Sequence, residues 1–176
     1  RRSSKIGGAT VFNEDTVKIH EEMESDSTDM ILTSIPFGDH YEYSDNYNDF
    51  GHNHGNDKFF EQMDFLTPEL KRILIPGRVA AIHVKDRILF SSMTEFSFPT
   101  ISPFHAECIV HFMKHGFGFL GMVSIETDVV RENNQTYRWK ENFEFDVTVT
   151  FFSNRPSRLV SYFTLITPPF PGKIGS

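Results

Sequence analysis

The chain has 176 residues, 19 of them Phe, which is enough for one domain with one apolar core. Its net charge of −7 disfavours binding to nucleic-acid phosphates, because such contacts depend on Lys and Arg. A nucleic-acid partner would therefore require a local basic face, or a DNA-binding part that lies elsewhere. The single cysteine, Cys108, excludes an internal disulfide framework and a multi-Cys zinc site. No apolar run approaches the roughly 20 residues that cross a bilayer, and no signal peptide is visible, so we expect a cytoplasmic protein with no membrane partner.

The N-terminal segment predicts a tail, a strand, a helix and a second strand. Residues 1–9 are small and basic and contain glycines, so we expect a flexible tail there. Residues 10–12 predict a short strand, and residues 17–23 predict a helix. The apolar run of residues 30–34 predicts a central buried strand that stops sharply at Pro36. Such strand ends are where open α/β sheets place their ligands.

A long loop and a long helix follow this strand. Residues 38–58 are polar and aromatic, and loops of this length are usually functional or disordered. Apolar side chains recur at helical spacing over residues 59–74. Pro68 lies inside this stretch, which predicts a kink or a restarted helix with Thr67 as its cap. Residues 76–78 predict the turn that leads out of the helix.

The next elements continue an alternating pattern. Residues 79–84 predict a second buried strand, and residues 85–100 predict a variable loop. The Ser-Pro pair at residues 102–103 predicts the start of a helix that closes at Gly116. Residues 119–125 predict a third strand. Strand, helix, strand, helix, strand with these spacings indicates an α/β protein with a mostly parallel sheet.

Residues 34–37, Ser-Ile-Pro-Phe, resemble the Asp/Asn/Ser-Pro-Pro-Tyr/Phe/Trp tetrapeptide of the amino-group DNA methyltransferases, which modify N6 of adenine or N4 of cytosine. Residues 11–15 and 27–32 before it and residues 48–53 after it extend the match, which looks close to phage and prophage members. Ile35 departs from the pattern, because many relatives have Pro there. This departure keeps the acceptor at the first position and removes rigidity from the turn.

The resemblance implies a Rossmann-like sheet of the S-adenosylmethionine-dependent methyltransferase type, in a bacterial or phage-infected cell. It covers residues 10–138 as a catalytic half, and it leaves residues 1–9 as a tail and residues 139–176 as a divergent β-rich tail. Within that tail, residues 143–150 alternate with period two, which predicts an amphipathic strand. Relatives also carry a Phe-x-Gly-x-Gly-like cofactor loop after the catalytic half. No such loop follows a predicted strand here, so we expect an incomplete fold.

The same resemblance implies roles for the tetrapeptide. Ser34, Pro36 and Phe37 would be catalytic. The Ser34 hydroxyl and a backbone carbonyl of the turn would orient the exocyclic N–H groups of the target base. Phe37 would stack on that base once it is flipped out of the duplex. Ile35 is expected to bind the substrate with them.

Three more residues each have a functional and a structural interpretation. The resemblance places Asp15 on the adenosine side of the cofactor, S-adenosyl-L-methionine, whereas its structural alternative is to cap the following helix. Tyr41 and Tyr43 are expected to bind substrate by stacking on bases. They could equally pack the loop against the body of the protein.

Two motif matches are rejected. Gly116, Gly118 and Gly121 fit Gly-x-Gly-x-x-Gly, but a helix precedes them and a strand follows, which reverses the order in a dinucleotide site. Gly116 is better explained as a helix C-cap. His105 and Glu107 fit the His-x-Glu of zinc deaminases, whose chemistry also needs two further cysteines. We therefore expect no metal.

The expected function is that of a site-specific DNA methyltransferase acting on double-stranded DNA. It would move a methyl group from S-adenosyl-L-methionine to the exocyclic amine of a flipped base, with adenine N6 preferred over cytosine N4. A missing cofactor-binding half, or a homodimer, would complete the enzyme. Two alternatives stay open: a catalytically silent nucleic-acid-binding fragment that lacks the cofactor loop, and a truncated product that folds poorly.

Overall fold

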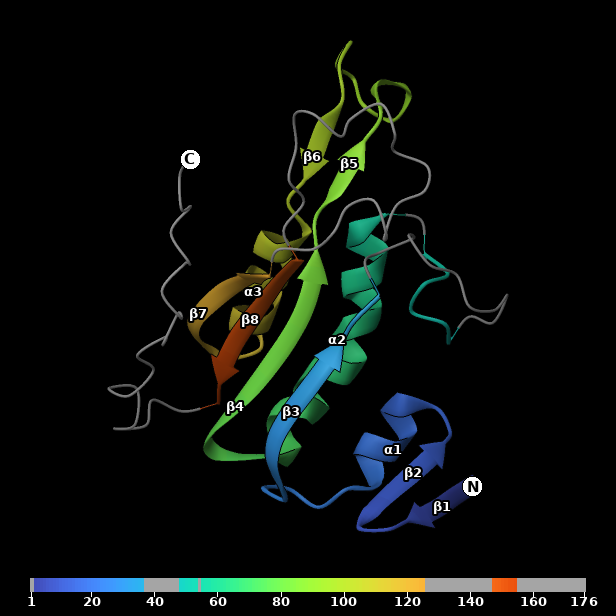
Figure 1. The fold of residues 1–176 in the computed structure, drawn as a ribbon, viewed down its shortest axis with the longest axis vertical. Helices are drawn as coiled ribbons and strands as arrows, with labels where there is room; N and C mark the ends of the chain where they lie inside the picture. Colours follow the sequence, from blue (N-terminus) through green and yellow to red (C-terminus); the bar gives the residue numbers. More distant parts are fainter. Residues whose placement is uncertain (1, 37–47, 54, 126–146, 155–176) are drawn as a thin grey trace, which may run out of the picture.

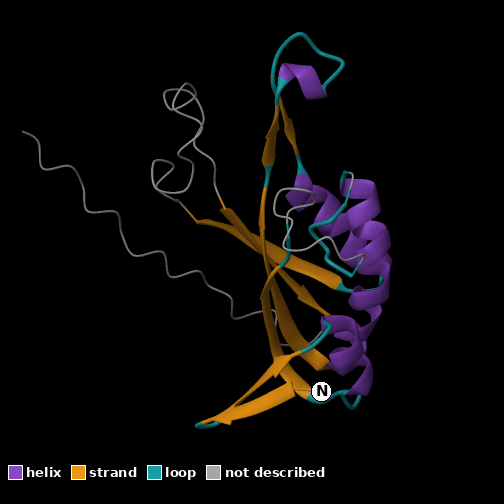
Figure 2. Cartoon of the chain, turned by 90° about the vertical axis from the view of Figure 1, so that its right-hand side faces the viewer, coloured by secondary structure: helices purple, strands orange, loops and turns teal. Residues whose placement is uncertain are grey.

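The computed structural model describes residues 2–36, 48–53, 55–125 and 147–154. Within these residues, the helices cover one face of a four-stranded sheet, and two small hairpins extend from its ends (Figures 1 and 2). No helix in these ranges is both long and apolar enough to span a membrane. The helices are α1 (Thr16–Glu22), α2 (Asn56–Ile73) and α3 (Phe104–Lys114), with a short 3-10 turn at Ser91–Met93. The strands are β1 (Arg2–Ile6), β2 (Ala9–Asn13), β3 (Thr28–Ser34), β4 (Leu74–Lys85), β5 (Arg87–Leu89), β6 (Thr100–Ser102), β7 (Gly118–Ile125) and β8 (Val147–Ser153).

The main sheet has the strand order β3-β4-β8-β7 (Figure 1). β3 and β4 are parallel and are joined through α2, whereas β8 is antiparallel to both of its neighbours. It follows that β7 points the same way as β3 and β4. Three of the four strands therefore share one direction, but β3 and β4 form the one parallel pair and the other two pairs are antiparallel. The expected α/β fold is confirmed, and its sheet is mixed.

β8 lies in the middle of this sheet and is not an appendage. Its Phe151 pairs with Ala81 of β4 on one side and with Gly121 of β7 on the other. The strand expected near residues 143–150 is therefore present as residues 147–153, and it lies between β4 and β7 in the same sheet. The division of the chain at residue 138 stays a prediction.

β3 was expected to be central and buried, and the structure corrects both points. It is an edge strand, with β4 as its one neighbour among the described residues. Ile31 is buried, but Met30 is 55% and Leu32 is 73% exposed. A run of apolar residues predicts a strand that is covered on both faces, whereas here the face carrying Met30 and Leu32 is open to solvent.

The two hairpins replace segments that were expected to lack regular structure. Residues 2–6, part of the expected tail, form β1 and pair with β2 through a tight turn at Gly7 and Gly8. Gly7 has φ +59, a conformation that favours glycine. Residues 87–89 and 100–102, at the two ends of the expected loop, pair as a second hairpin, β5–β6, which projects from the top of the sheet in Figure 1.

The α2 helix continues through Pro68 and does not restart there. Thr67 is fully buried and does not cap a helix, because its Oγ1 lies 2.9 Å from His111 Nε2 of α3. The expected turn at residues 76–78 falls within β4, where Gly77 has φ +84. Tertiary contacts with α3 thus hold α2 as one helix despite the proline.

The end of α3 at Gly116 is confirmed. The Gly116 N–H donates to Met113 O at 2.9 Å and the Phe117 N–H donates to Phe112 O at 3.1 Å. Gly116 itself has φ +82. These two bonds form a Schellman motif, which satisfies the last carbonyls of the helix and requires a left-handed residue at this position.

We expect Gly116→Ala to lower the free energy of unfolding by about 1–2 kcal/mol, because a Cβ disfavours the left-handed conformation. The added Cβ would also collide with Lys71 Nζ, but that flexible side chain can move. Urea denaturation measures the change. Gly8→Ala is the matched control, since its φ is not positive and its Cβ would meet nothing within 4 Å. Equal losses in both variants would contradict the expectation.

Candidate active site

The ends of two parallel strands bring Ser34 and His83 together. Ser34 is the last residue of β3, and it pairs in register with His83 of β4. Ser34 Oγ lies 2.8 Å from His83 Nδ1. The Ser34 side chain is exposed, while His83 is half-buried. An accessible hydroxyl is therefore held in one orientation at the carboxyl end of the parallel strands, where α/β proteins bind ligands.

The tautomer of His83 decides what this hydroxyl offers. When the imidazole proton is on Nε2, Nδ1 accepts the Ser34 O–H, and both lone pairs of Oγ can accept from a ligand. When the proton is on Nδ1, the ring donates to Oγ and occupies one lone pair. In both cases the bond restricts the Ser34 rotamer. Sequence reasoning missed His83, although its position in the second buried strand was predicted.

The other tetrapeptide residues differ in their environment. Ile35 is 4% exposed and belongs to the apolar core, so its side chain packs inside the protein. Pro36 is half-buried. Phe37, Tyr41 and Tyr43 lie outside the described residues, and their expected roles stay predictions.

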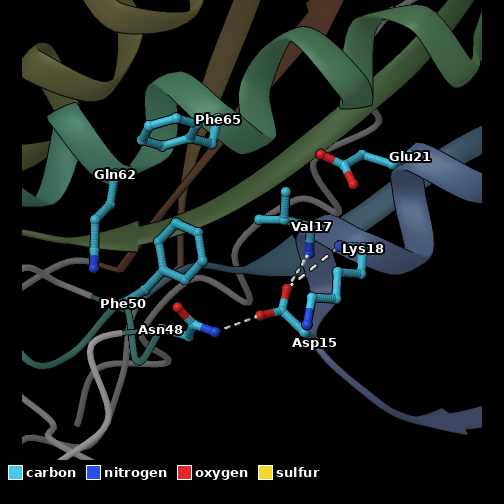
Figure 3. A pocket seen from close by; sticks show the side chains of 8 residues that line it. All are labelled: Asp15, Val17, Lys18, Glu21, Asn48, Phe50, Gln62 and Phe65. Atoms are coloured by element: carbon cyan, nitrogen blue, oxygen red, sulfur yellow. Dashed lines mark hydrogen bonds between the residues drawn. The ribbon is translucent and has the colours of Figure 1, made fainter. Parts of the chain in front are cut away.

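Asp15 caps α1 and also borders a cavity. Its Oδ1 accepts the N–H groups of Val17 at 2.9 Å and Lys18 at 3.3 Å, so the capping alternative is present. Its Oδ2 accepts a hydrogen bond from Asn48 Nδ2 at 3.0 Å (Figure 3). Asp15 is therefore fixed by two different segments, one on each side of β3 in the sequence.

The cavity beside Asp15 has a volume of about 460 Å³ and lies between α1, α2 and the segment that contains Asn48. Small-molecule sites typically span about 300–1,000 Å³ and combine apolar walls with a few polar groups. Here the rings of Phe50 and Phe65 face the space, and polar groups surround them (Figure 3). The lining residues are Asp15, Val17, Lys18, Glu21, Asn48, Phe50, Gln62 and Phe65.

Cys108 and His105 do not form a catalytic pair. Cys108 is fully buried, and this burial raises the pKa of its thiol to about 12, so a thiolate is not formed near neutral pH. His105 Nδ1 instead lies 2.7 Å from Asp86 Oδ2. This part of α3 is consistent with a structural role.

Comparison with known proteins supports the fold. No protein-family model matches the chain, and no curated protein matches its sequence. Among solved structures, one match is the PvuII DNA methyltransferase, which is cytosine-N4-specific. The sequence identity is 15% and the TM-score is 0.60, and the match covers 82% of this chain and 49% of the PvuII chain. A protein from Thermus thermophilus, described as a DNA modification methylase and solved with S-adenosyl-L-methionine, matches at 20% identity with a TM-score of 0.57 over 81% of this chain and 52% of its own.

These matches show that the described residues share the α/β fold of these two structures, which is consistent with the incomplete Rossmann-like fold expected from the sequence. The chain spans about half the length of the structures it resembles. The expectation of an incomplete fold of this type is therefore confirmed.

Proposed function

We propose that the chain is the target-base half of an S-adenosylmethionine-dependent DNA methyltransferase that modifies an exocyclic amine. The observation that carries this proposal is the exposed Ser34 hydroxyl, held 2.8 Å from His83 Nδ1 at the end of β3. The likeness of the fold to solved DNA methyltransferases supports it. Adenine N6 is the preferred target, and cytosine N4, the target of the PvuII enzyme, is the alternative.

The chemistry requires acceptors at this position. The amine lone pair of adenine or cytosine is delocalised into the ring, so the amine is a weak nucleophile. Ser34 Oγ and a backbone carbonyl of the turn would accept its two N–H groups and orient the lone pair towards the methyl donor. Phe37 would stack on the flipped base and keep it in place. Ser34 carries no charge, so the site stabilises the developing positive amine less than an Asp would.

On the basis of the function proposed above, we place the binding site for S-adenosyl-L-methionine beside Asp15. When bound, this cofactor supplies an electrophilic methyl group. The cavity next to Asp15 supports the assignment, because Phe50 and Phe65 offer apolar surfaces for an adenine and the Asp15 carboxylate offers an acceptor for hydroxyl groups. The glycine-rich loop that would hold the methionine end is not recognisable in the sequence.

A second polypeptide or a second copy of the chain would complete this cofactor site. β3 has no partner on its outer edge among the described residues, and Met30 and Leu32 expose apolar surface on that strand. The backbone groups on an open strand edge can pair with another strand, and the exposed apolar face beside it would be covered at the same time. The proposed partners are therefore duplex DNA and a cofactor-binding half, with a homodimer as the alternative.

Methyl transfer tests the function. The full chain is incubated with tritiated S-adenosyl-L-methionine and duplex DNA of varied sequence, and the DNA is digested to nucleosides for mass spectrometry. N6-methyladenine is expected, and N4-methylcytosine would change the target base. A chain that binds DNA in calorimetry, ignores the cofactor and transfers no methyl group would instead be the silent nucleic-acid-binding fragment. The absent glycine-rich loop is the observation that favours this second candidate.

Substitutions at Asp15 separate its cap from its charge. Asp15→Ala is expected to lower the free energy of unfolding by about 1 kcal/mol, whereas Asp15→Asn keeps the cap and changes it little. Both variants are expected to bind S-adenosyl-L-methionine about tenfold more weakly, because a hydrogen bond to a charged acceptor is lost. Thermal denaturation and calorimetry measure the two effects. Unchanged cofactor binding by Asp15→Asn would remove Asp15 from the site.

A further inference from the structure

A second cluster of polar side chains lies between α2 and the C-terminal end of α3, and the proposed function does not use it. It consists of Asp64, His111 and His115, and one ligand atom from each lies within 4.8 Å of the other two. Asp64 Oδ1 is 2.7 Å from His115 Nε2 and 3.8 Å from His111 Nδ1. His111 and His115 are four residues apart, so one helical turn places both rings on the same side of α3.

The surroundings of His111 fix its orientation. Its Nε2 lies 2.9 Å from Thr67 Oγ1, and its ring centroid is 5.0 Å from that of Phe60. If the Nε2–H donates to Thr67, then the Nδ1 lone pair points towards the carboxylate of Asp64. Two acceptors facing one another repel, and a cation between them would remove this repulsion. A hydrogen bond from the second ring nitrogen is also how metal-binding histidines are usually held.

Solvent reaches the cluster at two of its three residues. Asp64 is 39% exposed in its side chain and His115 is 17% exposed, so the cluster is open to ions from solvent.

We propose that Asp64, His111 and His115 bind one divalent transition-metal ion of the zinc class. Two imidazoles and one carboxylate suit zinc, cobalt or nickel better than magnesium or calcium, which prefer oxygen ligands. Ligand atoms around tetrahedral zinc are about 3.3 Å apart, so Asp64 and His115 would separate by about half an ångström and Asp64 and His111 would approach by a similar amount. Water would take the remaining position. The ion would join α2 to α3.

The ammonium group of Lys114 opposes this ion. Its Nζ lies 3.5 Å from Asp64 Oδ1, and its side chain is 67% exposed. A long exposed side chain can swing away, and its positive charge would then oppose the ion from a greater distance. We expect Lys114→Met to strengthen metal binding several-fold, because it removes both the competing contact and the charge.

Calorimetric titration of the full chain with zinc chloride tests the site, and cobalt absorption spectra report the ligands. One ion per chain is expected. Asp64→Asn and His115→Ala are each expected to weaken binding at least about tenfold. His105→Ala is the matched control, because it also removes a histidine from α3. His105 Nδ1 lies 2.7 Å from Asp86 Oδ2, and among the described residues this pair has no third ligand beside it.

The outcomes decide the proposal. Tight binding by the wild type and by His105→Ala, with weak binding by Asp64→Asn and His115→Ala, supports it. Absence of binding by the wild type overturns it, as does equal binding in all four proteins. Circular dichroism without metal establishes that each variant is folded, and Asp64→Asn, which keeps the size of the side chain, still tests the site if His115→Ala does not fold.

Discussion

Replacement of Phe152 by Ala is expected to lower the free energy of unfolding by about 3–5 kcal/mol, the usual loss for a buried aromatic ring. Phe152 is fully buried on β8. Its ring stacks on Phe112 of α3 with centroids 4.7 Å apart and an interplanar angle of 16°, and it contacts Phe117 and Phe119 edge-on or tilted. Since small domains are stable by about 5–15 kcal/mol, this single change would remove much of the stability.

Urea denaturation of the full chain measures this loss. Phe98→Ala is the control, because Phe98 is 58% exposed on the segment between β5 and β6 and should change stability by less than about 0.5 kcal/mol. A loss below about 1 kcal/mol for Phe152→Ala would mean that β8 does not pack into the sheet. That result would support a separate C-terminal tail after all.

Ser34→Ala is expected to slow methyl transfer by about a hundredfold, because a misoriented amine loses the alignment that lets its lone pair attack. His83→Ala is expected to slow it by a smaller factor, about tenfold, because Ser34 Oγ stays in place and loses only its orienting partner. In the proposed function His83 does not contact the base. It acts by holding Ser34 Oγ, which lies 2.8 Å from its Nδ1.

Single-turnover transfer rates with saturating cofactor and DNA measure both effects. The double variant should be no slower than Ser34→Ala alone, since residues that act as a unit are not additive. Ser91→Ala, on the exposed 3-10 turn, is the control and should leave the rate unchanged. If the two losses multiply in the double variant, then His83 acts independently of Ser34 and the positioning role is wrong.

Local patterns in the sequence predicted most individual elements. The apolar spacing within α2, the Asp15 cap of α1 and the glycine at the end of α3 each depend on residues within one or two helical turns, and each is present in the structure. The placement of β8 between β4 and β7 could not be predicted in this way, because it depends on pairing between residues far apart in the sequence. The same limit explains β3, whose edge position depends on which strands are its neighbours.

The residues of the candidate sites could also be predicted only where they depend on nearby sequence. Ser34 and Asp15 were identified from the sequence around them. His83 was missed because it is 49 residues from Ser34 and meets it only through the register of β3 and β4. The contact between Asp64 and His115 spans 51 residues and depends on how α2 packs against α3. A strand-register prediction would have identified His83, whereas the metal cluster requires the helix packing as well.

Photo-crosslinking shows whether the end of β3 receives a base that is extruded from DNA. A duplex carrying 5-iodouracil in place of the methylated base is irradiated with the full chain, and the attached peptide is identified by mass spectrometry. We expect attachment within residues 34–37, at Phe37, and its loss in Phe37→Ala. Attachment confined to Phe96 or Phe98 on the β5–β6 segment, with none near Ser34, would contradict this claim.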